Sequence, residues 1–274
     1  HKLGNDAEAA DAISAGVFES NADNAMFPFE SSAKNAAPMY QSWNVDNRSD
    51  FAVGHSFMTL LKGENMQDTT GNDISANPFA GATDPRLPVY AQPNDSGNYI
   101  GMFIAESSAD AAPFVWESLP GNAIINTPNY EATLMEYAEV AFILAERNGW
   151  DQTHYENGVR ASMQKWGVAD ADIDAYITAL PAAGEETVLT QKYIALYMQG
   201  HTAWMEYRRT GYPKTLIMPG DDYQVVGDPD YPETTYKEVF TPLVAVTDLP
   251  ARMRYPQYEQ TLNGENRAEA VGRL

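Results

Sequence analysis

The chain has 274 residues, 44% of them hydrophobic, which is enough for a sizeable folded core. Its 17 basic and 38 acidic residues give a formal net charge of -21, so repulsion disfavours binding to nucleic acid or to an anionic membrane surface. The absence of cysteine excludes disulfides, zinc-thiolate sites and thiol nucleophiles. No apolar run reaches the length of about 18 residues that a membrane-spanning helix needs.

Residue composition and hydrophobic spacing change along the sequence and divide the chain into three segments, which we expect to form one domain. Residues 1–128 form a loop-rich segment with short helices, and their Asn, Asp, Gly and Pro content marks it as the part expected to face a ligand. Hydrophobic spacing predicts a helix over residues 6–15 and another over about residues 50–61.

Helical periodicity dominates residues 129–213. Two capping-box patterns, Thr133 with Glu136 and Thr153 with Glu156, are expected to begin the first two helices. Glycines, a proline and the apolar spacing set the remaining boundaries. The four predicted helices cover about residues 133–147, 153–166, 170–180 and 185–208.

Helices joined by such short turns pack as antiparallel neighbours, like the pairs of tetratricopeptide-type scaffolds, although the full repeat consensus is missing. Residues 214–274 return to prolines and loops, and we expect them to wrap the helices. The predicted fold class is therefore mostly α, with long loop-rich segments and little β structure.

The common enzyme motifs are missing from this sequence. It contains no Gly-rich phosphate loop, no Gly-x-Ser-x-Gly elbow and no His-Glu-x-x-His motif. Asp170, Asp172 and Asp174 are spaced like the start of a calcium loop, but Ala175 and Pro181 occupy the positions that need Gly and Glu. We therefore predict no catalytic residue, no metal site and no cofactor.

Aromatic rings in polar loops are the best candidates for a ligand surface, because flat rings stack on the apolar faces of sugars while amides, carboxylates and guanidinium groups bind hydroxyls. Trp43 stands in such a loop with Asn44 and Arg48, and these three residues are the first candidate site. A tryptophan at the rim of the core is the alternative interpretation for Trp43.

Three further rings are candidates for the same surface. Tyr90 and Tyr99 flank a polar loop, and Trp116 follows the short apolar run 113–115. Packing against the core is the alternative for each of these rings.

The segment 206–213, Glu-Tyr-Arg-Arg-Thr-Gly-Tyr-Pro, resembles a long signature of the SusD/RagB family, and Trp204 also matches it. Further segments resemble the family in the same order along the chain: 84–87, 136–140, 144–146, 155–162, 191–196 and 252–259. At the end of its helix, the Arg208-Arg209 pair is expected to bind carbonyls and acidic neighbours while Gly211 ends the helix.

This resemblance implies a SusD-like scaffold at the extracellular face of a bacterial outer membrane. Such a protein is not an enzyme: it captures a glycan or a peptide and passes it to a SusC-like TonB-dependent transporter. The resemblance implies contact with the membrane only through a lipid anchor, which this chain does not contain.

Two other classes of function remain open from the sequence. A helical protein-interaction scaffold would bind through its helix faces, and a glycoside hydrolase would need two carboxylates that face each other in a cleft. Family members are usually longer, with a lipoprotein signal and an acylated cysteine, so we expect the chain to be a fragment, with a short variant as the alternative.

Overall fold

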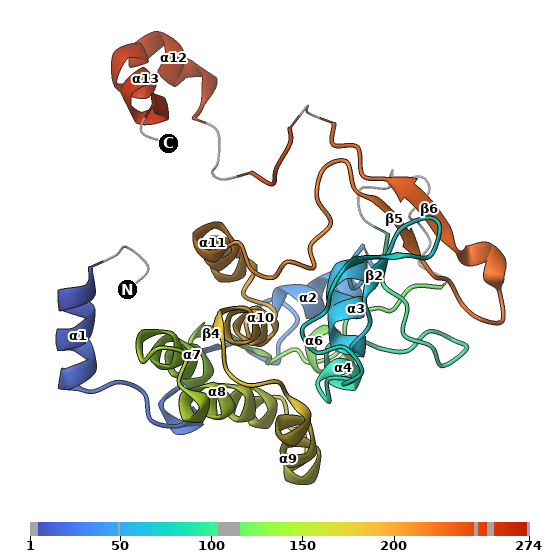
Figure 1. The fold of residues 1–274 in the computed structure, drawn as a ribbon, viewed down its shortest axis with the longest axis horizontal. Helices are drawn as coiled ribbons and strands as arrows, with labels where there is room; N and C mark the ends of the chain where they lie inside the picture. The colour runs from blue at the N-terminus through green and yellow to red at the C-terminus, as the bar shows by residue number, and fades with distance from the viewer. Residues whose placement is uncertain (1–4, 49, 104–115, 244–245, 251–254, 273–274) are drawn as a thin grey trace.

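The computed structural model describes residues 5–48, 50–103, 116–243, 246–250 and 255–272. As the sequence predicts, the fold is mostly helical with a few short strands (Figure 1). Its α-helices are α1 (Asp6–Ala15), α2 (Pro38–Tyr40), α3 (His55–Lys62), α4 (Leu87–Tyr90), α6 (Asn122–Ile125), α7 (Tyr137–Arg147), α8 (Gln152–Lys165), α9 (Asp170–Ala179), α10 (Glu185–Ala195), α11 (Gly200–Thr210), α12 (Gln257–Leu262) and α13 (Gly264–Gly272). Single turns are η1 (Asn21–Asp23), the π-helical η2 (Gln41–Val45) and η3 (Pro232–Thr234).

Two small antiparallel sheets join distant parts of the chain. The strands β1 (Ala25–Pro28) and β4 (Glu131–Met135) form one sheet. The other has the order β3-β2-β5-β6, with β2 (Met66–Gln67), β3 (Asp73–Ser75), β5 (Asp222–Val225) and β6 (Tyr236–Val239). This second sheet places the start of the C-terminal segment beside residues 66–75.

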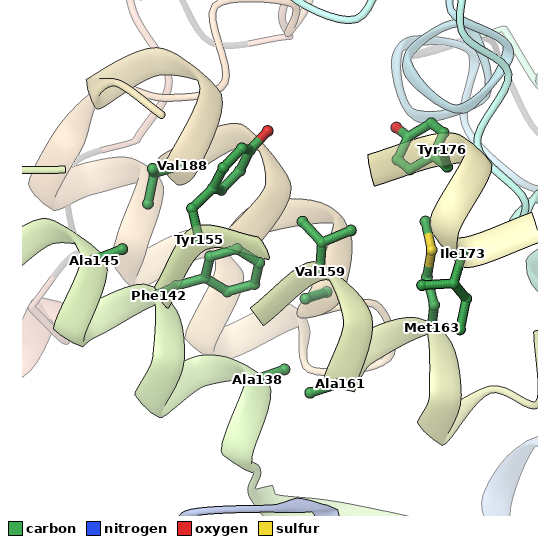
Figure 2. Close-up of a cluster of buried hydrophobic side chains, with 11 residues drawn as sticks. Ala138, Phe142, Ala145, Tyr155, Val159, Ala161, Met163, Ile173, Tyr176 and Val188 are labelled. Atoms are coloured by element: carbon green, nitrogen blue, oxygen red, sulfur yellow. The ribbon is translucent and has the colours of Figure 1, made fainter. Parts of the chain in front are cut away.

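The main core lies among α7, α8, α9 and α10, where apolar side chains at helical spacing face one another (Figure 2). Phe142 of α7 and Tyr155 of α8 are fully buried there, and their rings lie 6.5 Å apart between centroids. Gly158 allows this close packing, because a Cβ atom at that position would lie 2.9 Å from the Phe142 ring. The predicted helix pairs are therefore confirmed for α7 and α8.

The first predicted capping box is wrong. Thr133 lies in β4, opposite Met26 of β1, and the helix begins only at Tyr137 after an extended Glu136. Pairing with a strand far away in the sequence therefore overrides the local capping signal. The second box is also displaced, since the Asp151 carboxylate rather than Thr153 accepts the capping hydrogen bond, from the backbone N–H of His154 at 2.9 Å.

The long fourth helix of the sequence prediction is two helices, α10 and α11. Between them Met198 adopts a left-handed backbone with φ of 67°. The neighbouring Tyr197 ring packs on Tyr90 and Phe57, with centroids 4.3 and 5.2 Å away, and its hydroxyl donates to the Tyr90 carbonyl at 3.0 Å. These tertiary contacts hold the chain in a turn where propensity alone favours continued helix.

The two helices predicted in the N-terminal segment are confirmed in part. The bounds of α1 agree with the predicted helix over residues 6–15, whereas α3 starts later than predicted because residues 51–54 are not helical. Val53 in that stretch donates to the Ser118 carbonyl and accepts from Met102.

No residue of α12 or α13 is buried, and both helices lie apart from the main body in Figure 1.

The signature segment 206–213 forms an ionic cluster at the end of α11. Arg209 donates two hydrogen bonds to Glu146 of α7, at 2.7 and 2.8 Å, and a third to Glu206 at 3.0 Å. Glu206 also accepts from the buried Lys192 of α10 at 2.8 Å, and Gly211 ends the helix with φ of 71°. The predicted bracing role is confirmed for Arg209, which ties α11 to α7.

Arg86 is fully buried and joins the loop before α4 to the helical core. Its guanidinium donates to both carboxylate oxygens of Asp84, at 2.9 and 2.6 Å, to Ser162 of α8 at 2.9 Å and to Gln191 of α10 at 2.6 Å. The Asp84 carboxylate is equally buried. A buried ion pair is stable only when its hydrogen-bonding groups are satisfied, and these contacts meet that need.

We predict that Asp84→Asn destabilises the protein by about 3–5 kcal/mol, because it leaves the Arg86 charge buried without its counterion. The free energy of unfolding in urea measures this loss. A matched control is Asp174→Asn at the exposed Arg160–Asp174 pair, where the loss should stay below about 1 kcal/mol. Equal losses for the two variants would contradict the structural role of the buried pair.

Candidate ligand-binding site

A pocket of about 660 Å³, lined by both polar and apolar side chains, lies between α3, residues 97–101, β5 and the chain that follows it. Its walls carry amide, hydroxyl and charged side chains together with the ring of Tyr99. Gly101 sets the distance between two walls, because a Cβ atom there would lie 2.4 Å from the Cα of His55. The backbone N–H of His55 also donates to the carbonyl of Met102 at 2.9 Å.

The loop at the rim of this pocket is held by a buried carboxylate. Asp228 accepts hydrogen bonds from the side-chain amides of Asn94 and Asn98, at 2.8 and 3.3 Å, and from the backbone N–H of Asp230 at 2.9 Å. Desolvation acts to raise the pKa of Asp228, but these hydrogen bonds outweigh it and hold the pKa below its usual value. Asp228 therefore stays ionised at neutral pH and fixes the loop.

The same loop positions an aromatic pair. The Asn94 amide donates to the carbonyl of Trp116 at 3.0 Å, and the Trp116 ring lies 4.3 Å from the Tyr231 ring, centroid to centroid. Tyr231 is 42% exposed. Two predicted rings, Tyr99 and Trp116, thus belong to one region around the Asn94 loop, and Tyr231 joins them without having been predicted.

Tyr90 does not contribute to this surface. It is fully buried, its hydroxyl donates to the carbonyl of Ile194 at 3.4 Å, and its ring packs against Trp166 and Tyr197. The alternative interpretation, packing in the core, therefore describes Tyr90. The run 113–115 before Trp116 lies outside the described residues, as do Arg252–Arg254 of the C-terminal family motif.

The Trp43 group lies on a different part of the chain, at η2. The Trp43 ring stacks on Phe51, with centroids 5.8 Å apart, and Phe51 is 50% exposed. Asn44 donates to the carbonyl of Ile125 at 2.7 Å, which ties η2 to the end of α6, and the exposed Arg48 forms an ion pair with Asp50. Polar groups predicted to bind a ligand are thus already engaged within the protein.

His55 forms part of the pocket wall and stacks on Tyr223. Burial, together with the nearby charge of Lys62, lowers the pKa of His55 to about 4, against a small opposing effect of a hydrogen bond with the backbone of Gln224. The imidazole is therefore neutral at pH 7 and can accept or donate one hydrogen bond. Among the described residues, no group of three or more His, Asp or Glu side chains could hold a metal ion.

This pKa predicts a pH dependence of stability. The folded pKa of about 4 lies below the unfolded value of 6.5, so the contribution of neutral His55 is fully present above pH 6.5 and is lost as the pH falls toward 4. Between pH 7 and pH 5 the loss is at most about 2 kcal/mol. In His55→Gln the decrease in unfolding free energy over this range should be smaller by that amount; identical decreases in both proteins would contradict the prediction.

No helix in the described part of the chain is long and apolar enough to cross a membrane.

Comparison with known structures shows the same fold in proteins of low sequence identity. A chitin-binding protein superimposes with a TM-score of 0.65 at 23% identity, covering 97% of this chain and 55% of the other. A protein described as Bacteroidetes AC2a SusD-like gives 0.62 at 19% identity, with 97% and 62% covered.

A chitin-binding SusD homologue from Flavobacterium johnsoniae gives a TM-score of 0.58 at 21% identity, with 94% of this chain and 53% of that chain covered. The chain thus spans little more than half the length of these solved structures. No curated protein sequence matches the chain.

Two family profiles match the sequence itself. The first, SusD-like_2, described as starch-binding and associating with the outer membrane, matches residues 3–226, and the second, described as SusD and RagB outer membrane lipoprotein, matches residues 182–274. These matches cover most of the chain, and the signature segment 206–213 lies in both. The chain belongs to the SusD/RagB family.

Proposed function

We propose that this chain is part of a non-enzymatic glycan-binding protein of the bacterial outer membrane, and that the pocket beside α3 is its binding site. The observation that carries the proposal is a pocket whose wall combines amide, hydroxyl and charged side chains with the half-buried Tyr99, beside a loop that hydrogen bonds hold in place. The volume of about 660 Å³ falls within the range typical of small-ligand sites. Tyr99 offers a ring for stacking, and Trp116 with Tyr231 extends the aromatic surface.

The polar lining suits hydroxyl recognition. Amide side chains such as those of Asn98 and Gln224 both donate and accept hydrogen bonds, as each sugar hydroxyl does. The family description names starch, and two of the similar structures are described as chitin-binding. Maltooligosaccharides and chitooligosaccharides are therefore the first ligands to test, with peptides as the rival class.

The half-buried Trp43 ring stacks on the exposed Phe51, and we include this pair in the proposal as a second surface for a long glycan. Retention of Trp43→Ala on immobilised polysaccharide tests this part. Reduced retention with unchanged thermal stability supports the platform. Unchanged retention would leave Trp43 as a rim residue that only packs on Phe51.

We predict that Tyr99→Ala and Trp116→Ala each weaken oligosaccharide binding by roughly threefold to tenfold, the equivalent of about 0.5–1.5 kcal/mol for one stacked ring. Isothermal titration calorimetry measures the dissociation constants. Tyr258→Ala is the matched control, since this tyrosine is 60% exposed on α12 and lies outside the pocket. Wild-type affinity in both aromatic variants would contradict the proposed site.

We further propose that the protein delivers its ligand to a SusC-like TonB-dependent transporter at the extracellular face, where a lipid anchor holds it. Purification from native outer membranes in mild detergent should yield the protein with a TonB-dependent barrel in near-equal amount, identified by mass spectrometry. Recovery without a barrel would favour a helical interaction scaffold. Oligosaccharide cleavage during incubation with the purified protein would favour a hydrolase.

A further inference from the structure

We propose that the pocket beside α3 selects uncharged saccharides and discriminates against acidic ones such as uronic acids. This inference rests on the proposed function and names the class of glycan for the same site. It follows from how the charged groups of the pocket are paired and from which of them remain available to a ligand.

The cation in the described wall of the pocket is already paired. Lys62 forms a salt bridge with Glu64, with 2.9 Å between Nζ and Oε2, and the lysine side chain is 32% exposed. A ligand carboxylate would have to compete with Glu64 for this ammonium group. An exposed pair of this kind is weak, but it removes the advantage that a free lysine would give an anionic ligand.

The carboxylates of the pocket leave an excess of negative charge. Besides Glu64, the wall contains Asp73, whose oxygen accepts a hydrogen bond from the neutral Asn65 amide at 2.7 Å. Asp228, under the rim loop, is held by the neutral amides of Asn94 and Asn98. None of these hydrogen bonds cancels a formal charge, so an acidic sugar would meet Glu64 and Asp73 in the wall, with the buried Asp228 beneath the rim loop.

The histidine of the wall supplies no compensating positive charge at neutral pH. His55 stacks on Tyr223 and lies near Lys62, and its surroundings favour the neutral imidazole. The whole chain adds to the effect, because a formal net charge of -21 repels anions over the screening length.

The remaining polar groups of the wall suit neutral ligands. The Gln224 amide donates to the Gln67 side chain at 3.2 Å, and Thr83 donates to the Lys62 carbonyl at 3.3 Å. These groups and Asn98 keep unused hydrogen-bonding capacity that hydroxyl and acetamido groups can meet without a charge. Recognition by such groups does not require a cation in the site.

The test compares uncharged tetrasaccharides, maltotetraose and tetra-N-acetylchitotetraose, with tetragalacturonate by isothermal titration calorimetry. At an ionic strength of about 0.02 M we expect the acidic ligand to bind at least tenfold more weakly than the better neutral one, and we expect the ratio to shrink at about 0.5 M as screening increases. Asp73→Asn and Glu64→Gln should each reduce the ratio roughly threefold at low salt. The control Asp172→Asn removes the same charge from α9 and should leave the ratio unchanged.

Each outcome has one meaning. Acidic binding as tight as neutral binding, or a ratio that neither pocket variant changes, overturns the charge selectivity while the proposed glycan site stands. Failure of both neutral and acidic saccharides to bind overturns the proposed function itself, and with it this inference. Circular dichroism of each variant verifies that it is folded before its affinities are compared.

Discussion

The buried ion pair between Arg86 and Asp84 is the contact on which the position of the rim loop depends. It fixes the start of α4 against α8 and α10 in the interior, where a guanidinium must find several acceptors at once. From α4 the chain continues directly to the rim: Gln92 donates to the Leu119 carbonyl at 2.8 Å, and the Asn94 turn follows two residues later. A short stretch of chain thus links the helical core to the rim loop of the pocket.

The ionic cluster of the family signature repeats this arrangement beside the next residue of α10, since Gln191 accepts from Arg86 while Lys192 donates to Glu206. Arg209 bridges α11 to Glu146 of α7, and Glu206 receives both Arg209 and the buried Lys192. In each cluster an arginine is enclosed by carboxylates or amides from elements that the sequence keeps apart. Such contacts stabilise one packing of the helices, because alternative packings would leave a buried charge unpaired.

Local periodicity was sufficient to predict the helix pairs but not the places where distant segments meet. The apolar spacing in α7 and α8 is visible in the sequence, whereas the pairing of Thr133 with Met26 is not, and it replaces the expected cap by a strand. Charge alone would have placed Arg86 at the surface, since arginine is almost never fully buried unless paired. In the sequence, only the resemblance of residues 84–87 to a family motif singled out the segment that contains Arg86.

For the aromatic residues of the candidate site, too, the sequence does not show which distant segments pack against them. Tyr90 and Trp116 both follow short apolar runs in the sequence, yet Tyr90 is enclosed by Tyr197 and Trp166 because α10 ends beside it. Tyr231 could not be assigned to Trp116 without knowing that Asp228 anchors the Asn94 loop. A ring's role here depends on which distant segment covers it.

The electrostatics of the rim loop give Asp228 a structural role and not that of a general acid. A general acid of a glycosidase needs a carboxyl group whose pKa is raised by an apolar pocket. Asp228 is the opposite case, because amide donors hold its pKa low and its oxygens are occupied in fixing the loop. A carboxylate so engaged holds the rim loop in one conformation, and at the proposed site a loop ordered in advance lowers the entropic cost of binding.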